Sequence, residues 1–290
     1  MQNTREFHVV TNKLRAFFLS KGFIEVPSQS RLSILAACED PKTISKFIMT
    51  GVEWPLPQTG QMWLERELLE HKDWKGVFCS STSYRDEPNP IAGRHERIFP
   101  MFEFEQHGSF EDLKTLETEM LKYLGFEAPI IMDYEKLCSK YETDTLEAEH
   151  ESTMCNEISQ SIILEKFPQR SHPFWNMNYA GDGIFDKVDV ILHGMETIGS
   201  AARSCNPGEM REFFHSVSDG GYAQLLFDKF GKDRVMAELN DYLSLDFVPR
   251  FGGGIGVTRM ASAMNKAGLL QKDDVSFYGA IKTSVDRLTA

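Results

Sequence analysis

The stretch Ser83–Glu105 reads SYRDEPNPIAGRHERIFPMFEFE, and the fold prediction starts from it. Apolar and aromatic residues recur at short spacing in Val77–Cys79 before it and in Ile98–Glu105 at its end. Such segments are typical of β-strands. The turn-forming residues between them are Pro88, Asn89, Pro90 and Gly93. The pattern therefore predicts a long antiparallel hairpin.

The tip of this hairpin is dense in charge. Its charged residues are Arg85, Asp86, Glu87, Arg94, His95, Glu96 and Arg97. Guanidinium groups bind phosphate oxygens in bidentate fashion, and Phe99 beside them can lie against a flat base. These features suit a polyanion. Composition alone favours at least as strongly a surface hairpin with a solvated charge cluster.

A glycine-rich segment lies near the other end of the chain. Phe251–Met260 reads FGGGIGVTRM and places Gly254, Gly256 and Arg259 just where an apolar helical pattern begins. Glycine lets the backbone approach a ligand closely, and a strand-to-helix turn offers amide groups to an anion. By itself, such a turn is a weak signal.

A third segment carries two carboxylates. Asp189–Arg203 reads DVILHGMETIGSAAR, and apolar residues alternate with Asp189 and His193 as in a strand, with Glu196 following across Gly194. Carboxylates gathered on one sheet face either share a proton or hold a hard cation.

Together these segments resemble the class II aminoacyl-tRNA synthetases. RDE followed by RHxxxF resembles their motif 2, and the GxGxGxxR pattern resembles their motif 3. The segment Asp189–Arg203 is similar, in length and register, to DLVLNGxELGGGSxR of the aspartyl and asparaginyl branch and of the stand-alone archaeal asparagine synthetase related to it. GFIEVPSQS at 22–30 resembles motif 1, which implies a homodimer, although Gln29 stands where the family has proline and Pro27 comes two residues early.

The resemblance implies ATP and Mg²⁺ as cofactors and assigns a role to each matching residue. The ATP-binding residues would be Arg85, Glu87, Arg94, His95, Phe99, Glu196, Gly254, Gly256 and Arg259, with Arg85 and Arg259 catalytic and Asp189 and Glu196 holding magnesium. The amino acid would be bound by Gln61, Glu103 and Arg203, with Arg203 facing a side-chain carboxylate. An internal ion pair is the alternative for Arg203. Three departures, Leu64, Ile98 and Met101, fall on the amino-acid side.

Composition adds limits to these predictions. The chain has 290 residues, a formal charge of −12 and five cysteines without a CxxC pair. An acidic chain is a poor candidate for strong non-specific nucleic-acid binding, and the cysteine pattern favours reduced thiols. No apolar run reaches membrane-spanning length, and the N-terminus lacks a signal-peptide core, so we expect a cytoplasmic protein.

The expected fold is one α+β domain over 1–290, an antiparallel sheet of about six strands flanked by helices. A small insertion at 128–172 would pack beside the sheet, 33–57 would be loop-rich and contain Glu39 as a candidate ammonium contact, and a tail helix would follow Lys266.

The predicted function is that of an ATP-dependent ligase that activates aspartate or a similar acid as an adenylate. The sequence begins at the motif 1 helix, with no room for the anticodon-binding barrel of the branch. The expected acceptor is therefore not tRNA, and ammonia is the first candidate. Two alternatives are a compact tRNA ligase and a non-catalytic paralogue that binds a nucleotide or amino acid.

Overall fold

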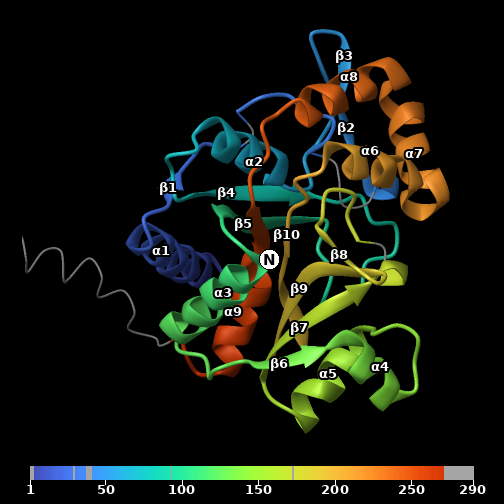
Figure 1. The fold of residues 1–290 in the computed structure, drawn as a ribbon. Coiled ribbons are helices and arrows are strands. Elements are labelled where there is room, and N and C mark those ends of the chain that lie inside the picture. The colour runs from blue at the N-terminus through green and yellow to red at the C-terminus, as the bar shows by residue number, and fades with distance from the viewer. Residues whose placement is uncertain (1–2, 29, 37–40, 92, 172, 271–290) are drawn as a thin grey trace, which may run out of the picture.

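A mixed β-sheet forms the centre of the computed structural model, which describes residues 3–270 except 29, 37–40, 92 and 172. Within this range nine strands form the sheet in the order β1-β4-β5-β11-β10-β9-β7-β6, with β8 paired to β9 (Figure 1). Their bounds are β1 Ile24–Glu25, β4 Gly76–Tyr84, β5 Ile98–His107, β6 Ile130–Asp133, β7 Ser161–Pro168, β8 Tyr179–Gly181, β9 Ile184–Leu192, β10 Met195–Ala202 and β11 Arg250–Gly256.

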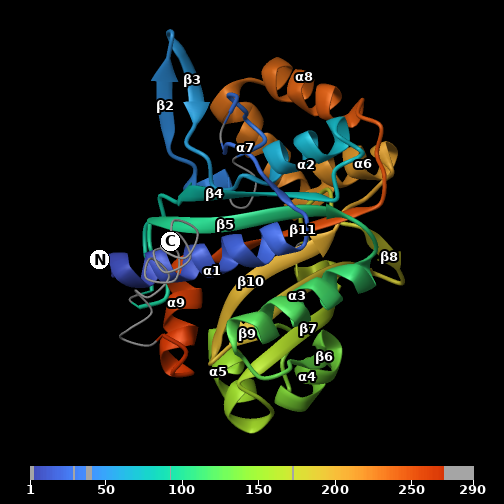
Figure 2. The same ribbon diagram turned by 90° about the vertical axis from the view of Figure 1, so that its left-hand side faces the viewer.

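Helices surround this sheet on both faces. They are α1 Thr4–Ser20, α2 Gln61–Glu70, α3 Phe110–Leu124, α4 Tyr134–Tyr141, α5 Ala148–Glu157, α6 Pro207–Ser216, α7 Gly221–Phe230, α8 Lys232–Leu243 and α9 Val257–Lys266. In Figure 2, α2, α7 and α8 lie above β4 and β5, whereas α1, α3 and α9 lie below them. Short 3₁₀ helices are η1 Pro41–Thr43, η2 Gln169–Ser171 and η3 Val217–Gly220.

The predicted hairpin is confirmed as β4 and β5. The two strands pair antiparallel from Gly76 opposite Gln106 to Tyr84 opposite Ile98. Beyond the last pair, the Arg85 amide donates to the Arg97 carbonyl at 2.7 Å. This hydrogen bond joins the two strands at the point where the charged loop begins. The ladder thus fixes both ends of the loop 85–97.

Strand alternation divides the side chains between two faces. On one face Phe102 and Phe104 of β5, with Val188 and Val190 of β9, join the main core against α1, α3 and α9. A fully buried side chain of this kind contributes roughly 1.5–3 kcal/mol. The alternate residues of β5 and β9, which include Glu103 and Asp189, therefore lie on the opposite face.

That opposite face is covered at its two ends. Helices α4 and α5 pack on β7 and β9 through an apolar cluster that includes Leu137, Met154 and Ile191. Helix α2 packs on β4 through Leu64 and Leu68, and α6, α7 and α8 form a further cluster beside it. These helices leave the middle of this sheet face open to a binding site.

Local capping signals account for the helix bounds. Ser109 and Asp112 form a capping box at the start of α3, and Gly125 ends it in a left-handed conformation with φ of 100°. Asn3 accepts a hydrogen bond from the Arg5 amide at the start of α1. Both helix starts are therefore set by residues next to them in the sequence.

The structure corrects several predictions about the strands. The sheet has more than about six strands, and 128–172 is part of it: β6 and β7 from this segment extend the sheet, with β6 parallel to β7, while α4 and α5 pack on its face. The pairing of β1 with β4 is also parallel. The segment 33–57 contains an antiparallel hairpin of β2 Lys46–Met49 and β3 Val52–Pro55. His193 lies in the β9–β10 turn with φ of 49° and not in the strand.

At the C-terminus, helix α9 ends at Lys266, and the predicted tail helix does not begin there, because 267–270 form a turn. The rest of that prediction, beyond residue 270, lies outside the described residues, as does Glu39. Among the described helices, none has both the length and the apolar character needed to span a bilayer.

Candidate active site

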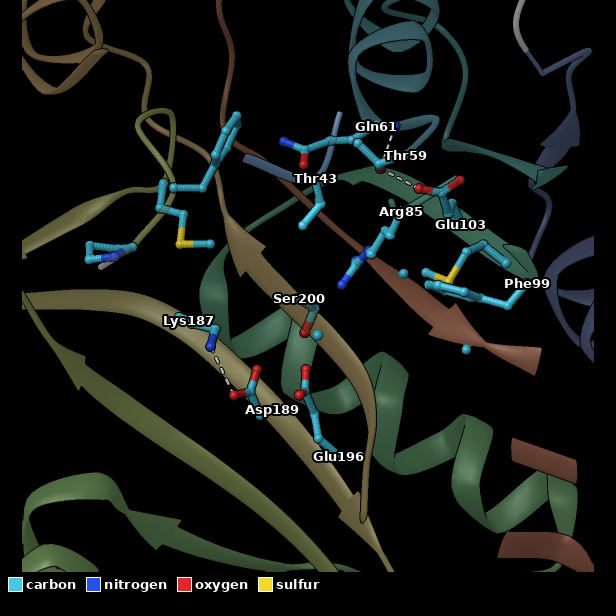
Figure 3. Close-up of a pocket in the computed structure, with 18 of the residues that line it drawn as sticks. Thr43, Thr59, Gln61, Arg85, Phe99, Glu103, Lys187, Asp189, Glu196 and Ser200 are labelled. Carbon is cyan, nitrogen blue, oxygen red and sulfur yellow. Dashed lines mark hydrogen bonds and ion pairs between the residues drawn. The ribbon is translucent and has the colours of Figure 1, made fainter. Parts of the chain in front are cut away.

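A cavity of about 780 Å³ opens on the middle of the sheet face between α2, α7 and the β9–β10 hairpin. Apart from Glu39, which lies outside the described residues, every site residue predicted from the sequence lines it: Gln61, Arg85, Glu87, Arg94, His95, Phe99, Glu103, Asp189, Glu196, Arg203, Gly254, Gly256 and Arg259. Figure 3 shows Arg85 and Phe99 on one side of it, with Asp189 and Glu196 facing them from the sheet. Segments that are distant in the sequence thus meet around one volume.

Arg85 and Phe99 form one wall of the cavity. They come from opposite ends of the charged loop, and the Arg85 guanidinium carbon lies 5.3 Å from the centroid of the Phe99 ring. A guanidinium over an aromatic face is held by a cation–π interaction. This contact presents a positive charge and a flat apolar surface side by side.

Three other charged residues of the loop, Glu87, Arg94 and His95, are tied to partners. His95 Nδ1 lies 2.8 Å from Glu87 Oε1, which links the two sides of the loop. Arg94 donates to Glu151 Oε1 at 2.5 Å, and Glu151 Oε2 accepts the Glu196 amide at 2.7 Å. Glu151, which the sequence analysis missed, therefore connects the loop to the strand that carries Glu196.

Asp189 and Glu196 converge on an open point of the sheet. A methyl carbon placed on Gly199 would lie 3.2 Å from Glu196 Oε1 and 3.7 Å from Asp189 Oδ1. Asp189 Oδ1 is buried without a hydrogen-bond partner among the described residues. Burial raises the pKa of Asp189, and the Glu196 charge raises it further, although the Lys187 charge opposes both.

These two carboxylates fit a magnesium ion. Mg²⁺ is commonly held by one or two carboxylates, with water and substrate phosphates as its other ligands. The described residues contain no cluster of three or more candidate ligand side chains. Gly199 leaves the space between the two carboxylates open.

Each of the two carboxylates also has a cationic neighbour. Lys187 Nζ donates to Asp189 Oδ2 at 2.8 Å, and Arg259 Nη1 lies 3.7 Å from Glu196 Oε2 while donating to the Glu196 carbonyl at 2.9 Å. Burial lowers the pKa of Lys187, but Asp189 and Glu196 outweigh it, and the net pKa is raised. Sequence reasoning missed Lys187, although strand alternation places it on the face of Asp189.

Glu103 lies under the turn that precedes α2. Its carboxylate accepts hydrogen bonds from the Ser81 hydroxyl and from the Gly60 amide at 2.8 Å. It also accepts a hydrogen bond from the Thr59 hydroxyl (Figure 3). Burial raises the pKa of Glu103 in spite of these hydrogen bonds. These hydrogen bonds hold the carboxylate in place at the edge of the cavity.

Gln61 is oriented by a buried network. Its Nε2 donates to Glu65 Oε1 at 2.7 Å and to Asn176 Oδ1 at 3.2 Å. Glu65 is itself held by the Arg250 guanidinium at 2.6 Å and by the Tyr242 hydroxyl at 2.6 Å. Both of these contacts use the amide nitrogen of Gln61, so among the described residues its oxygen stays available to a donor from the cavity.

Arg203 is engaged by an acidic side chain of the protein. Its Nη2 and Nε donate to Glu105 Oε1 at 2.6 and 3.1 Å, and the Arg203 side chain is 4% exposed. The internal pair considered from the sequence is therefore present. It does not remove Arg203 from the cavity wall, because Arg203 and Glu105 both line the cavity. Glu105 Oε2 has no partner among the described residues.

The positions that depart from the family pattern differ in exposure. Leu64 and Met101 line the cavity, so they take part in shaping it. Gly254 lies directly beside Met101: a methyl carbon on Gly254 would lie 2.7 Å from Met101 Cε, so the end of that side chain would have to move. Ile98 is 62% exposed and lies outside this cavity wall.

Comparison with known proteins identifies the family. Residues 1–278 match the family of class II tRNA synthetases (D, K and N). A comparison with curated protein sequences finds no match.

Solved structures share the fold at low sequence identity. Asparaginyl-tRNA synthetase from Pyrococcus horikoshii, complexed with asparaginyl-adenylate, has a TM-score of 0.74 at 16% identity, over 91% of this chain and 65% of that one. The Entamoeba histolytica asparaginyl enzyme, also with asparaginyl-adenylate, gives 0.69 at 18%, over 90% and 63%. The aspartyl enzyme of Entamoeba histolytica gives 0.64 at 17%, over 90% and 54%.

The chain thus spans less than two thirds of each of these structures. The family match extends over nearly the whole chain, and the sheet carries the three motif segments around one cavity. The chain belongs to the class II tRNA synthetase family (D, K and N).

Proposed function

We propose that the protein activates an amino acid with ATP, forming an aminoacyl-adenylate and pyrophosphate. The observation that carries this proposal is the convergence of the three motif segments on one cavity. The family match supports an ATP-dependent ligase at the coarser level. The assignment of single residues rests on the motifs and on the contacts described above.

The reaction needs positioning and charge neutralisation more than a protein nucleophile. A substrate carboxylate oxygen attacks the α-phosphorus in line, a new P–O bond forms, and the bond to the pyrophosphate leaving group breaks. Holding the two reactants together can remove roughly 7–11 kcal/mol of the barrier. Arg85 would hold the α-phosphate and the attacking carboxylate, and preplaced charge of this kind stabilises the transition state.

The nucleotide would lie along the loop and the glycine-rich strand. Phe99 would stack on the adenine and Glu87 would accept its amino group, while His95, Arg94 and Arg259 would bind the outer phosphates. Gly254 and Gly256 keep the strand surface free of side chains along this path. Asp189 and Glu196 would hold magnesium, which supplies charge neutralisation at the phosphates when it is bound.

The amino acid would lie between Gln61, Glu103 and Arg203. The Gln61 oxygen and the Glu103 carboxylate offer acceptors to an α-ammonium group, and Arg203 offers a donor to the side chain. An acidic side chain or a carboxamide satisfies a guanidinium of this kind. Aspartate or an aspartate-like acid is therefore our first candidate.

Pyrophosphate exchange tests this proposal. Labelled pyrophosphate and ATP are incubated with the protein and a panel of amino acids that includes aspartate and asparagine, in the absence of an acceptor. Exchange that depends on one amino acid would support adenylate formation and name the substrate. Wild-type protein that binds amino acid or ATP without exchange under any condition would point to a non-catalytic paralogue and contradict the proposal.

We further propose that the acyl group passes to an acceptor other than tRNA, with ammonia as the first candidate. The net charge of −12 supports this choice, because the field of an acidic chain opposes a polyanionic partner. The family match favours the second candidate, a compact tRNA ligase. Ammonia-dependent formation of the free amide supports the first candidate, and a stable ester with tRNA supports the second.

A homodimer is the expected assembly. Strand β1, in the region that resembles motif 1, has both of its residues exposed, and Ile24 is an apolar side chain in this position. An exposed apolar strand is a common interaction surface. Light scattering on the purified chain at several concentrations tests this expectation, and a monomer throughout would contradict it.

A further inference from the structure

Lys187 places a positive charge in the cavity. The motif resemblance assigns no role to this residue. We propose that Lys187 is a further catalytic residue whose ammonium group binds the phosphate chain of ATP. The inference rests on the proposed function, since it assumes that the cavity receives a nucleotide. It adds a fixed cation of the protein on the side of the cavity opposite Arg85 (Figure 3).

The position of Lys187 follows from strand β9. Lys187 precedes Asp189 by two residues, so both side chains leave the same face of the sheet. The side chain lines the cavity and is 23% exposed. The ammonium group is held in place by an aromatic ring, because Nζ lies 4.0 Å from the centroid of the Phe167 ring on the neighbouring strand β7.

The hydrogen-bonding capacity of Lys187 exceeds what the protein uses. A lysine ammonium carries three donors. Among the described residues, the ammonium group of Lys187 donates to Asp189 Oδ2 at 2.8 Å. An ammonium with donors to spare, held at the wall of a large cavity, is suited to an anionic oxygen of a ligand.

The charges around Lys187 favour an oligophosphate. Arg85 and Arg259 line the same cavity, so cations of three different segments surround one volume. The carboxylates of Asp189 and Glu196 are each offset by one of the two nearest cations, Lys187 and Arg259. This part of the wall is therefore close to neutral before magnesium binds, and it does not repel a polyanion.

A second lysine in the same fold provides the matched control. Lys114 Nζ pairs with Glu165 at 2.7 Å and lies 4.8 Å from the centroid of the Phe110 ring. It has the same type of partners as Lys187 but does not line the cavity. Lys114→Met therefore shows what the loss of a lysine–carboxylate pair does to the fold without a change of charge in the cavity.

The experiment measures ATP binding by calorimetry in EDTA and again with magnesium, using the full-length protein. Lys187→Met should weaken magnesium-free ATP binding by at least about tenfold, as expected for the loss of a charge-assisted contact. Lys187→Arg should retain most of the affinity, and Lys114→Met should match the wild type. Should Lys187→Met fail to fold, Lys187→Gln keeps a donor for Asp189 and removes the charge.

The outcomes separate the two proposals. If Lys187→Met, or Lys187→Gln in its place, binds magnesium-free ATP as tightly as the wild type does, the role of Lys187 is overturned. The proposal of amino-acid activation is not affected by that result. Loss of affinity that Lys187→Arg does not restore would also overturn it, because a missing charge is then not the cause. Wild-type protein that binds no ATP in either condition would refute the proposed function and the role of Lys187 together.

Discussion

Arg203 illustrates how a buried ion pair can prepare a residue for a ligand. Nη2 and Nε of Arg203 both donate to Glu105 Oε1, so this carboxylate fixes the plane of the guanidinium at the cavity wall. A charge held by the protein in this way needs little reorganisation when substrate arrives. Glu105 is therefore best regarded as the residue that positions Arg203.

Replacement of Arg203 by lysine tests this role. Arg203→Lys keeps the charge but loses the planar fork, so KM for the amino acid should rise at least about tenfold while KM for ATP changes little. Arg170→Lys is the matched control, because Arg170 makes two hydrogen bonds to Glu135 at 2.5 and 2.8 Å on the exposed surface. An equal rise of both KM values in Arg203→Lys would indicate a general loss of structure.

Glu117 gives a prediction about pH. It lies beneath the sheet on α3, where Oε1 accepts the Ser200 hydroxyl at 2.6 Å and Oε2 has no partner among the described residues. Burial raises the pKa of Glu117 to about 8, from the usual 4.5. Between these values the unfolded chain binds fewer protons than the folded one, so the free energy of unfolding falls as pH rises.

Glu117→Gln should remove this dependence. The variant keeps the oxygen that accepts from Ser200 and has no proton to lose. Chemical denaturation should show the wild type losing roughly 2–4 kcal/mol more than the variant between pH 5 and pH 9. Glu105, whose pKa burial raises to about 7, titrates in both proteins, so the difference between them isolates Glu117. Parallel pH curves for the two proteins would show that Glu117 is ionised in the fold.

At the scale of elements, helix α5 supports the charged loop from the side. Glu151 on α5 accepts from Arg94 in the loop and from the amide of Glu196 at the start of β10. Two segments of the site are thus joined through one carboxylate of the segment 128–172. This segment therefore belongs to the construction of the site as well as to the sheet.

Glu151→Ala should accordingly weaken ATP binding without abolishing it. Arg94 would lose its partner, and the loop would have to be ordered by the ligand itself, which should raise KM for ATP about three- to tenfold. Glu149→Ala, an exposed position on the same helix, should leave KM unchanged. The measurement is the ATP dependence of pyrophosphate exchange, and a normal KM in Glu151→Ala would show that Arg94 is held by other contacts.

The same contacts show which parts of the structure a sequence can predict. The β4–β5 hairpin and the capped helix α3 follow from local signals, namely alternation, turn residues and a capping box. The partners of the site do not. Glu65 binds Arg250 across 185 positions of the chain, and Arg94 binds Glu151 across 57. No local pattern encodes such pairs, because the packing of separate elements brings them together.

The strand β6 shows a related limit. Its four residues are too few for a clear alternation, and the segment around it reads as acidic and amphipathic. Only its parallel pairing with β7 makes it a strand of the sheet. The roles of the motif residues could be proposed from family likeness, whereas Lys187 required the position of its ammonium in the cavity.

For the whole molecule, the cavity joins parts of the fold that are otherwise packed separately. One apolar cluster lies beneath the sheet, and another is formed by α6, α7 and α8 above it. The cavity wall includes Arg203 and Asp189 from the sheet side and Leu225 from α7. A ligand that fills it contacts both sides and should stabilise the folded chain as a unit.

Thermal unfolding should therefore report ligand binding. A ligand at one hundred times its Kd stabilises the folded state by about 2.7 kcal/mol, which for a chain of this size corresponds to a rise in Tm of roughly 5 °C. ATP with magnesium should produce this rise in wild type and in Arg170→Ala, whose mutated side chain lies outside the cavity wall. Arg259→Ala should show little of it, because the cation next to Glu196 is gone. A full rise in Arg259→Ala would place the nucleotide away from the glycine-rich strand and contradict the arrangement proposed for ATP.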